Sequence, residues 1–121
     1  MNSRRVLCVD DNVSLQSSLK IGLGNYGLEV LTSSDGFDAL RQYKEHAGDF
    51  GAILTDNDMP QMSGLEFVQS VREIGYKGRI VVMSGNLKPE RLRAYQTYGI
   101  SGFFHKPFEV SLLATMLLQH D

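Results

Sequence analysis

The chain has 121 residues, of which 42% are apolar and 21% charged, and its formal net charge is −2 at pH 7. This length fits one domain with a single core, so we predict one domain over residues 1–121. No apolar stretch approaches the roughly 18 residues that span a bilayer, and the basic residues are scattered. We therefore predict neither a membrane nor a nucleic-acid partner. The single cysteine, Cys8, and the lack of an apolar signal segment favour a cytoplasmic location.

Short apolar runs bounded by turn residues alternate with segments of helical periodicity along the whole chain. The runs predict strands over 5–10, 28–32, 52–56, 79–84 and 102–105. Five helices are indicated by apolar residues at helical spacing, listed in chain order: Leu15, Leu19, Leu23 and Tyr26; Phe37, Leu40 and Ala47; Leu65, Val68 and Val71; Leu92, Tyr95 and Tyr98; Val110, Leu113, Met116 and Leu117. Asp11 or Asn12 is the expected N-cap of the first helix.

Five strands alternating with five helices predict an α/β fold in which one parallel sheet is covered by helices on both faces. On the last predicted helix, Leu112 and Leu118 lie off the apolar stripe. We expect part of this apolar surface to remain exposed.

The residues that carry chemistry stand where apolar runs end. Asp56 ends the third run and precedes a turn-rich loop, and Asp10 and Asp11 follow the first run. Ser84 ends the fourth run and Lys106 follows the fifth. In open parallel sheets ligands bind at the carboxyl ends of the strands, so we expect these five residues to form one site.

Three carboxylates close together repel each other unless a cation neutralises them. Magnesium prefers oxygen ligands and is usually held by one or two carboxylates together with phosphate oxygens. Asp10, Asp11 and Asp56 therefore indicate a Mg²⁺ site that also receives a phosphoryl group. Lys106 supplies a positive charge and Ser84 a hydroxyl donor for the phosphoryl oxygens, while Asp56 is the expected nucleophile.

Four motifs in this order resemble a response-regulator receiver domain of the chemotaxis type over the whole chain. They are the acid pair Asp10-Asp11, the loop T-D-N-D-M-P-Q-M-S-G, the run V-V-M-S-G and the segment F-F-H-K-P-F. The resemblance implies a flavodoxin-like fold with strand order 2-1-3-4-5. It also implies that Asp56 accepts a phosphoryl group from a histidine kinase or a histidine phosphotransfer protein.

The resemblance further assigns roles within the site. Asp11, Asp56 and the backbone carbonyl of Asp58 would hold Mg²⁺, with Asp10 acting mainly through a bound water, and Lys106-Pro107 would be a cis peptide. Ser84 and Phe103 would be the switch residues that change the face formed by the fourth helix, the fifth strand and the fifth helix. An output protein of unknown identity, or a second copy of the chain, would bind that face.

Two positions depart from the commonest family pattern. Asp58 is often Asn or Met in the family, and an extra carboxylate there can either assist or repel the attacking water, so the lifetime of the phosphorylated state stays open. Phe103 stands where many members carry a switchable Tyr or His. Because Phe103 has no hydroxyl, any aromatic switch is left to packing.

Two other functions compete with the phosphoacceptor switch. Asp56 and Asp58 also resemble the strand-end D-x-D of haloacid-dehalogenase-like phosphatases, in which Asp58 would be the general acid of a Mg²⁺-dependent phosphohydrolase. A second alternative is an inert pseudo-receiver, which the complete set of five polar residues argues against. We expect a signalling switch rather than an enzyme, with chemistry limited to the phosphorylation and dephosphorylation of its own Asp56.

Overall fold

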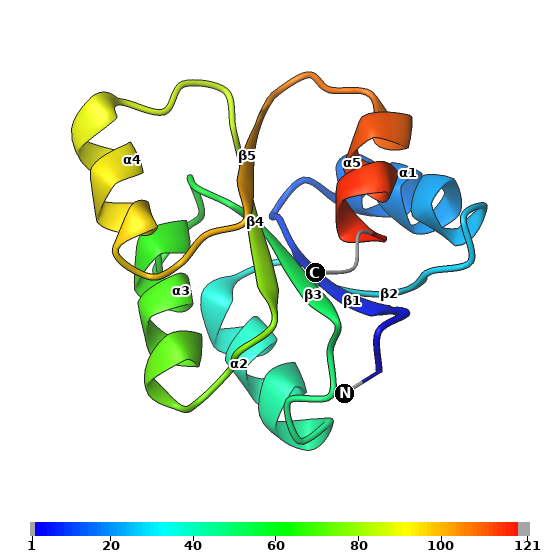
Figure 1. The fold of residues 1–121 in the computed structure, drawn as a ribbon, viewed down its shortest axis with the longest axis horizontal. Coiled ribbons are helices and arrows are strands. Elements are labelled where there is room, and N and C mark those ends of the chain that lie inside the picture. The colour runs from blue at the N-terminus through cyan, green and yellow to red at the C-terminus, as the bar shows by residue number, and fades with distance from the viewer. Residues whose placement is uncertain (1, 119–121) are drawn as a thin grey trace.

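The computed structural model describes residues 2–118 as five strands alternating with five helices (Figure 1). The strands are β1 (Arg5–Val9), β2 (Glu29–Ser33), β3 (Ala52–Asp56), β4 (Arg79–Ser84) and β5 (Gly102–His105). The helices are α1 (Val13–Gly24), α2 (Gly36–Glu45), α3 (Gly64–Glu73), α4 (Pro89–Gln96) and α5 (Val110–Leu117). The sheet order is β2-β1-β3-β4-β5, with every pairing parallel, so the predicted fold is confirmed.

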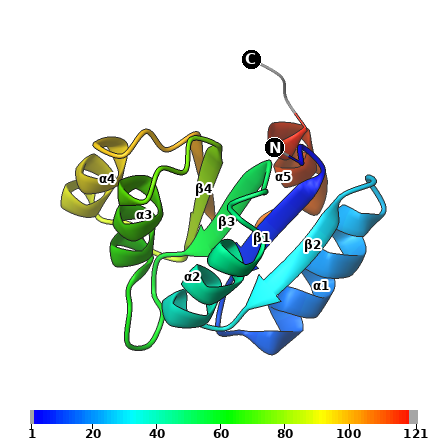
Figure 2. The same cartoon turned by 90° about the horizontal axis from the view of Figure 1, so that it is seen from below.

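Helices cover both faces of the sheet. Helices α1 and α5 lie on one face, while α2, α3 and α4 lie on the other (Figures 1 and 2). The side chains of β1 alternate between two cores, because Val6 and Cys8 pack on the first face and Leu7 and Val9 on the second. Strands buried on both faces read as continuous apolar runs, which explains why the sequence pattern located β1, β3 and β4.

The strand register sets which residues meet at the carboxyl edge. Val9 of β1 pairs with Thr55 of β3, so Asp10, which follows β1, and Asp56, the last residue of β3, emerge side by side. Asp56 pairs in turn with Met83 of β4, and Ser84 pairs with His105 of β5. The residues that follow the strands are therefore gathered along one edge of the sheet.

Element ends differ from the predictions by single residues. Strand β1 ends at Val9 instead of Asp10, and β2 lies one residue later than predicted. Asn12 is the N-cap of α1, because its side-chain oxygen accepts a hydrogen bond from the Leu15 N–H at 3.1 Å. Among residues 2–118, no helix has the length and apolarity that a membrane crossing requires.

The prediction that part of the apolar surface on the last helix remains exposed is confirmed by Leu112. Leu112 is 60% exposed, as expected from its position off the apolar stripe. Leu118 is partly buried and packs against the core beneath α1 and α5. Leu118 is the C-cap of α5, and at a helix end the regular 100° spacing no longer decides where a side chain points.

Candidate functional site

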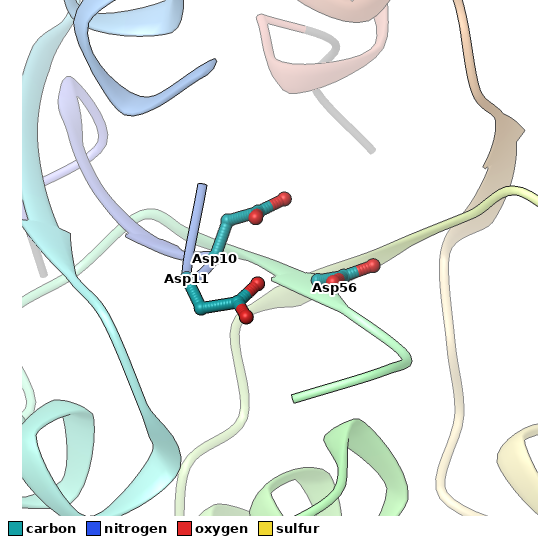
Figure 3. A group of neighbouring side chains, drawn as sticks. All are labelled: Asp10, Asp11 and Asp56. Atoms are coloured by element: carbon teal, nitrogen blue, oxygen red, sulfur yellow. The ribbon is translucent and has the colours of Figure 1, made fainter. Parts of the chain in front are cut away.

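Three carboxylates converge at the carboxyl edge of the sheet. One oxygen from each of Asp10, Asp11 and Asp56 lies within 4.8 Å of the others (Figure 3). Asp10 and Asp11 directly follow β1, and Asp56 is the last residue of β3. Asp10 is fully buried and Asp56 is 6% exposed, whereas Asp11 is exposed to solvent. The structure thus brings together the three carboxylates that the sequence places at strand ends.

Lys106 bridges the two buried carboxylates. Its ammonium nitrogen lies 2.7 Å from Oδ2 of Asp10 and 3.2 Å from Oδ1 of Asp56. Burial alone would lower the pKa of Lys106, but the hydrogen bonds and negative charges of Asp10 and Asp56 outweigh it and raise the pKa. The backbone N–H of Lys106 donates to the Ser84 carbonyl at 2.9 Å, and the Lys106-Pro107 peptide is cis, as the resemblance implied.

The pKa of Asp56 is raised, first because the carboxyl group is buried and next because Asp10 is negatively charged. The Lys106 ammonium and a hydrogen bond from the backbone N–H of Asp58 act in the opposite direction but do not cancel these effects. A folded chain without a cation therefore holds the Asp56 proton more tightly than an unfolded chain does.

The donor set fits a hard divalent cation. Carboxylate oxygens are ligands that Mg²⁺ prefers, and oxygens about 2.1 Å from an octahedral ion lie roughly 3 to 4 Å apart. The three carboxylate oxygens, all within 4.8 Å of one another, need only small rotations to approach this spacing. Asp10 has little freedom to join them, because Oδ1 accepts from the Asn12 N–H at 2.9 Å and Oδ2 from Lys106.

Ser84 and Phe103 lie outside the carboxylate cluster. Ser84 is the last residue of β4 and is buried, and its Oγ accepts a hydrogen bond from the Asn86 N–H at 3.1 Å. Phe103 lies on β5, is partly buried, and meets the ring of Tyr95 edge to face with 5.8 Å between centroids. The two residues sit on the neighbouring strands β4 and β5, with Ser84 at the carboxyl edge and Phe103 against Tyr95 of α4.

Asn57, between Asp56 and Asp58, is a site residue that the sequence analysis missed. Its side-chain oxygen accepts a 2.6 Å hydrogen bond from the buried hydroxyl of Tyr95 on α4. Its amide nitrogen donates to Oδ1 of Asp58 at 3.2 Å, and the Asp58 residue itself is exposed. An asparagine directly after a fully buried strand indicates that its amide needs a buried hydrogen-bond partner. Nothing in the sequence indicates that this partner is Tyr95 of α4.

The fold and this site define a class. Strand order reverses between β1 and β3, and in flavodoxin-like sheets this switch point is where ligands bind. The acidic cluster lies at that point. The family model of the response regulator receiver domain matches residues 6–118, so the chain belongs to the receiver domains of two-component response regulators.

Individual relatives agree with this family. The CAI-1 autoinducer sensor kinase/phosphatase CqsS of Vibrio cholerae is 34% identical over 93% of this chain and 16% of its own length. The transcriptional regulatory protein PrrA of Mycobacterium bovis is 34% identical over 93% of this chain and 48% of its own length. The chain thus spans less than half of each of these curated relatives.

Solved structures give the same result. The chemotaxis protein CheY4 of Vibrio cholerae superposes with a TM-score of 0.86 at 32% identity, covering 93% of this chain and 94% of that chain. The receiver fold is a signalling fold and not that of a classical enzyme family. These similarities do not support the phosphohydrolase alternative.

Proposed function

We propose that Asp56 is the phosphoacceptor of this receiver domain and that residues 1–121 belong to that one domain. The observation that supports it most is the placement of one lysine between two buried carboxylates, with a third carboxylate alongside. The donor is the phosphohistidine of a histidine kinase or a histidine phosphotransfer protein. Such a donor fits a cytoplasmic location, as the sequence predicts.

The transfer exchanges one bond for another. A carboxylate oxygen of Asp56 forms a bond to phosphorus while the phosphorus–nitrogen bond of the phosphohistidine breaks. The electron pair of that bond returns to the imidazole nitrogen, which then takes a proton from solvent. Lys106, held beside the acceptor by Asp10, binds one phosphoryl oxygen, and the Ser84 hydroxyl binds another after leaving the Asn86 N–H.

The residues that would hold Mg²⁺ are Asp11, Asp56 and the backbone carbonyl of Asp58. Asp10 would act through a bound water, which is supported by the hydrogen bonds that already engage both of its oxygens. The bound cation would neutralise the charge of the carboxylates and of the incoming phosphoryl group. Asp11 suits a direct ligand because it is exposed next to the buried pair.

The output is a change of the face formed by α4, β5 and α5, with Ser84 and Phe103 as the switch residues. When Ser84 moves toward the phosphoryl group, the loop that follows β4 moves with it, and Phe103 repacks against Tyr95. An output protein or a second copy of the chain then binds this face. The chemistry is limited to gain and loss of the domain's own phosphoryl group, so the domain acts as a switch and not as an enzyme.

The test is incubation with acetyl phosphate and Mg²⁺ followed by intact-mass spectrometry. We expect one acid-labile, hydroxylamine-sensitive phosphoryl adduct on the wild type, and none on Asp56→Asn. Asp38→Asn, which removes a surface carboxylate paired with Arg41, is the matched control and should be labelled normally. Absence of an adduct on the wild type, or an adduct that survives Asp56→Asn, refutes the proposal. Sustained turnover of small phosphate esters, lost in Asp58→Asn, would instead favour the phosphohydrolase.

A further inference from the structure

Helix α4 is held to the rest of the domain mainly through one side chain. Tyr95 is the fully buried residue of α4, and Lys88 at the N-cap makes no side-chain capping bond. Beyond the helix end, Arg72 of α3 donates to the carbonyls of Tyr98 and Gly99 at 2.8 and 3.0 Å. The C-terminal end of α4 is therefore fixed by Arg72, whereas the position of the helix body depends on Tyr95.

The polar end of Tyr95 reaches the residue that follows the phosphoacceptor. The Tyr95 hydroxyl donates to Oδ1 of Asn57 at 2.6 Å, and both residues are buried. The direction of this bond is fixed, because a carboxylate can only accept and the Asn57 amide nitrogen must face Asp58. The amide oxygen of Asn57 then faces Tyr95, whose hydroxyl must be the donor.

The backbone of Asn57 is also fully engaged. Its N–H donates to the Met83 carbonyl at 2.9 Å, and its carbonyl accepts from the Gly64 N–H at 3.0 Å. The next residue, Asp58, donates its backbone N–H to the Asp56 carboxylate. A change at that carboxylate is thus passed to the peptide unit joining Asn57 and Asp58.

Gly64, Tyr95 and Asn57 approach one another closely where this loop meets α4. A Cβ atom added at Gly64 would lie 2.6 Å from the Tyr95 hydroxyl oxygen and 2.9 Å from Cα of Asn57. The Tyr95 ring also meets Phe103 edge to face. Tyr95 therefore contacts both the acceptor loop, through Asn57, and the aromatic side chain proposed as a switch.

We propose that the Tyr95–Asn57 hydrogen bond couples phosphorylation of Asp56 to the position of α4, by a route that does not pass through Ser84. This inference rests on the proposed function of Asp56. Tyr95 and Asn57 are positioning residues, since neither contacts the reacting atoms. Such coupling is reciprocal. The factor by which phosphorylation changes the affinity of α4 for a partner is therefore also the factor by which that partner changes the phosphorylation equilibrium of Asp56.

Three variants separate coupling from stability. Tyr95→Phe leaves the buried Asn57 oxygen without its donor, and Asn57→Leu leaves the Tyr95 hydroxyl without its acceptor, so each single variant should be destabilised. The double variant replaces both partners by apolar groups of similar shape, which is nearly neutral for stability. Tyr98→Phe is the matched control, because its hydroxyl has no hydrogen-bond partner among residues 2–118.

The readout is hydrogen exchange of residues 88–98, measured with and without beryllium fluoride and Mg²⁺ as the phosphoryl mimic. We expect the mimic to change exchange in the wild type and in Tyr98→Phe. In the double variant the change in hydrogen exchange caused by the mimic should be roughly fivefold smaller, the factor that corresponds to one neutral hydrogen bond. Urea unfolding of the double variant should at the same time give the stability of the wild type.

Each outcome of this experiment either supports or overturns the coupling through Tyr95 and Asn57. A wild-type response in the double variant overturns the coupling and leaves the proposed function standing. No response of α4 in a wild type that acquires the phosphoryl group on Asp56 overturns the coupling and the proposed output through α4, but leaves Asp56 as the phosphoacceptor. A wild type that is not phosphorylated on Asp56 by acetyl phosphate overturns both.

Discussion

Replacing Asp56 by asparagine should stabilise the domain in the absence of a divalent cation. One carboxylate oxygen of Asp56 lies within 4.8 Å of one of Asp10, so at an effective dielectric constant of about 20 their repulsion is at least about 3.5 kcal/mol. The attraction to Lys106 at 3.2 Å is about 5 kcal/mol on the same scale. Burial of the carboxylate adds a penalty of roughly several kcal/mol, so the charged group is a net cost to folding, in line with its raised pKa.

We expect Asp56→Asn to raise the free energy of unfolding by about 1 to 2 kcal/mol in EDTA at pH 7.5, after the opposing effects largely cancel. The pKa of Asp56 is raised above its unfolded value, so the folded chain binds this proton more tightly. Wild-type stability from this group therefore increases as the pH falls through the folded pKa. The advantage of the variant should fade as the pH falls through the raised pKa of Asp56, because the wild-type carboxyl group then becomes protonated.

Urea unfolding followed by circular dichroism measures this difference at several pH values. Mg²⁺ at ten times its dissociation constant should stabilise the wild type by roughly 1.4 kcal/mol. It should stabilise the Asp56→Asn variant by less, so the difference in free energy of unfolding between the two proteins becomes smaller. Asp38→Asn should show no gain, since Asp38 pairs with Arg41 and its pKa is lowered. An Asp56→Asn variant that is less stable than the wild type in EDTA, or one whose advantage does not depend on pH, would refute the electrostatic reasoning.

Three further predictions address other parts of the domain. Lys106→Met should slow phosphorylation by acetyl phosphate about 10- to 100-fold, the factor corresponding to one charge-assisted hydrogen bond; an unchanged labelling rate would exclude a role for the ammonium. Arg72→Leu removes the donor to four backbone carbonyls, those of Tyr76, Gly78, Tyr98 and Gly99, and should cost about 3 kcal/mol in urea unfolding. Arg72→Lys should recover only part of this loss, because a lysine lacks the planar fork; full recovery would contradict the argument. Burial raises the pKa of Cys8 to about 12, so Ellman's reagent at pH 8 should react only as fast as the chain unfolds, and rapid labelling of native protein would show an accessible thiol.

The sheet and the carboxylate cluster were predictable because burial and topology leave direct marks in the sequence. Strands covered on both faces must be apolar throughout, and parallel strands end at one edge. Asp10, Asp11 and Asp56 therefore had to lie near one another once β1 and β3 were neighbours. The different exposure of Asp10 and Asp11 was not predictable. The two aspartates are adjacent in the sequence and look alike there, but Asp10 is fully buried and Asp11 faces solvent.

Contacts between distant elements escaped the sequence analysis. Asn57 and Tyr95 are 38 residues apart, and a tyrosine at helical spacing gives no sign that its hydroxyl reaches the acceptor loop. Arg72 on α3 donates to carbonyls in the loops that follow α3 and α4, and no motif in the sequence indicates these contacts. Leu118 lies off the apolar stripe in a helical projection but packs against the core, because the regular spacing no longer holds at the C-cap of α5. In each case the deciding partner lies on another element, or the backbone departs from regular geometry.

The central claim is that the carboxylate of Asp56 takes up the phosphoryl group, and reductive trapping tests it most directly. Borohydride reduces an acyl phosphate to an alcohol, so treatment of the phosphorylated wild type followed by peptide mass spectrometry identifies the modified side chain. We predict that Asp56 alone is converted to homoserine, and only after exposure to acetyl phosphate and Mg²⁺. Conversion of Asp10, Asp11 or Asp58 instead, or of no residue in a chain that carries a phosphoryl group, would contradict the account.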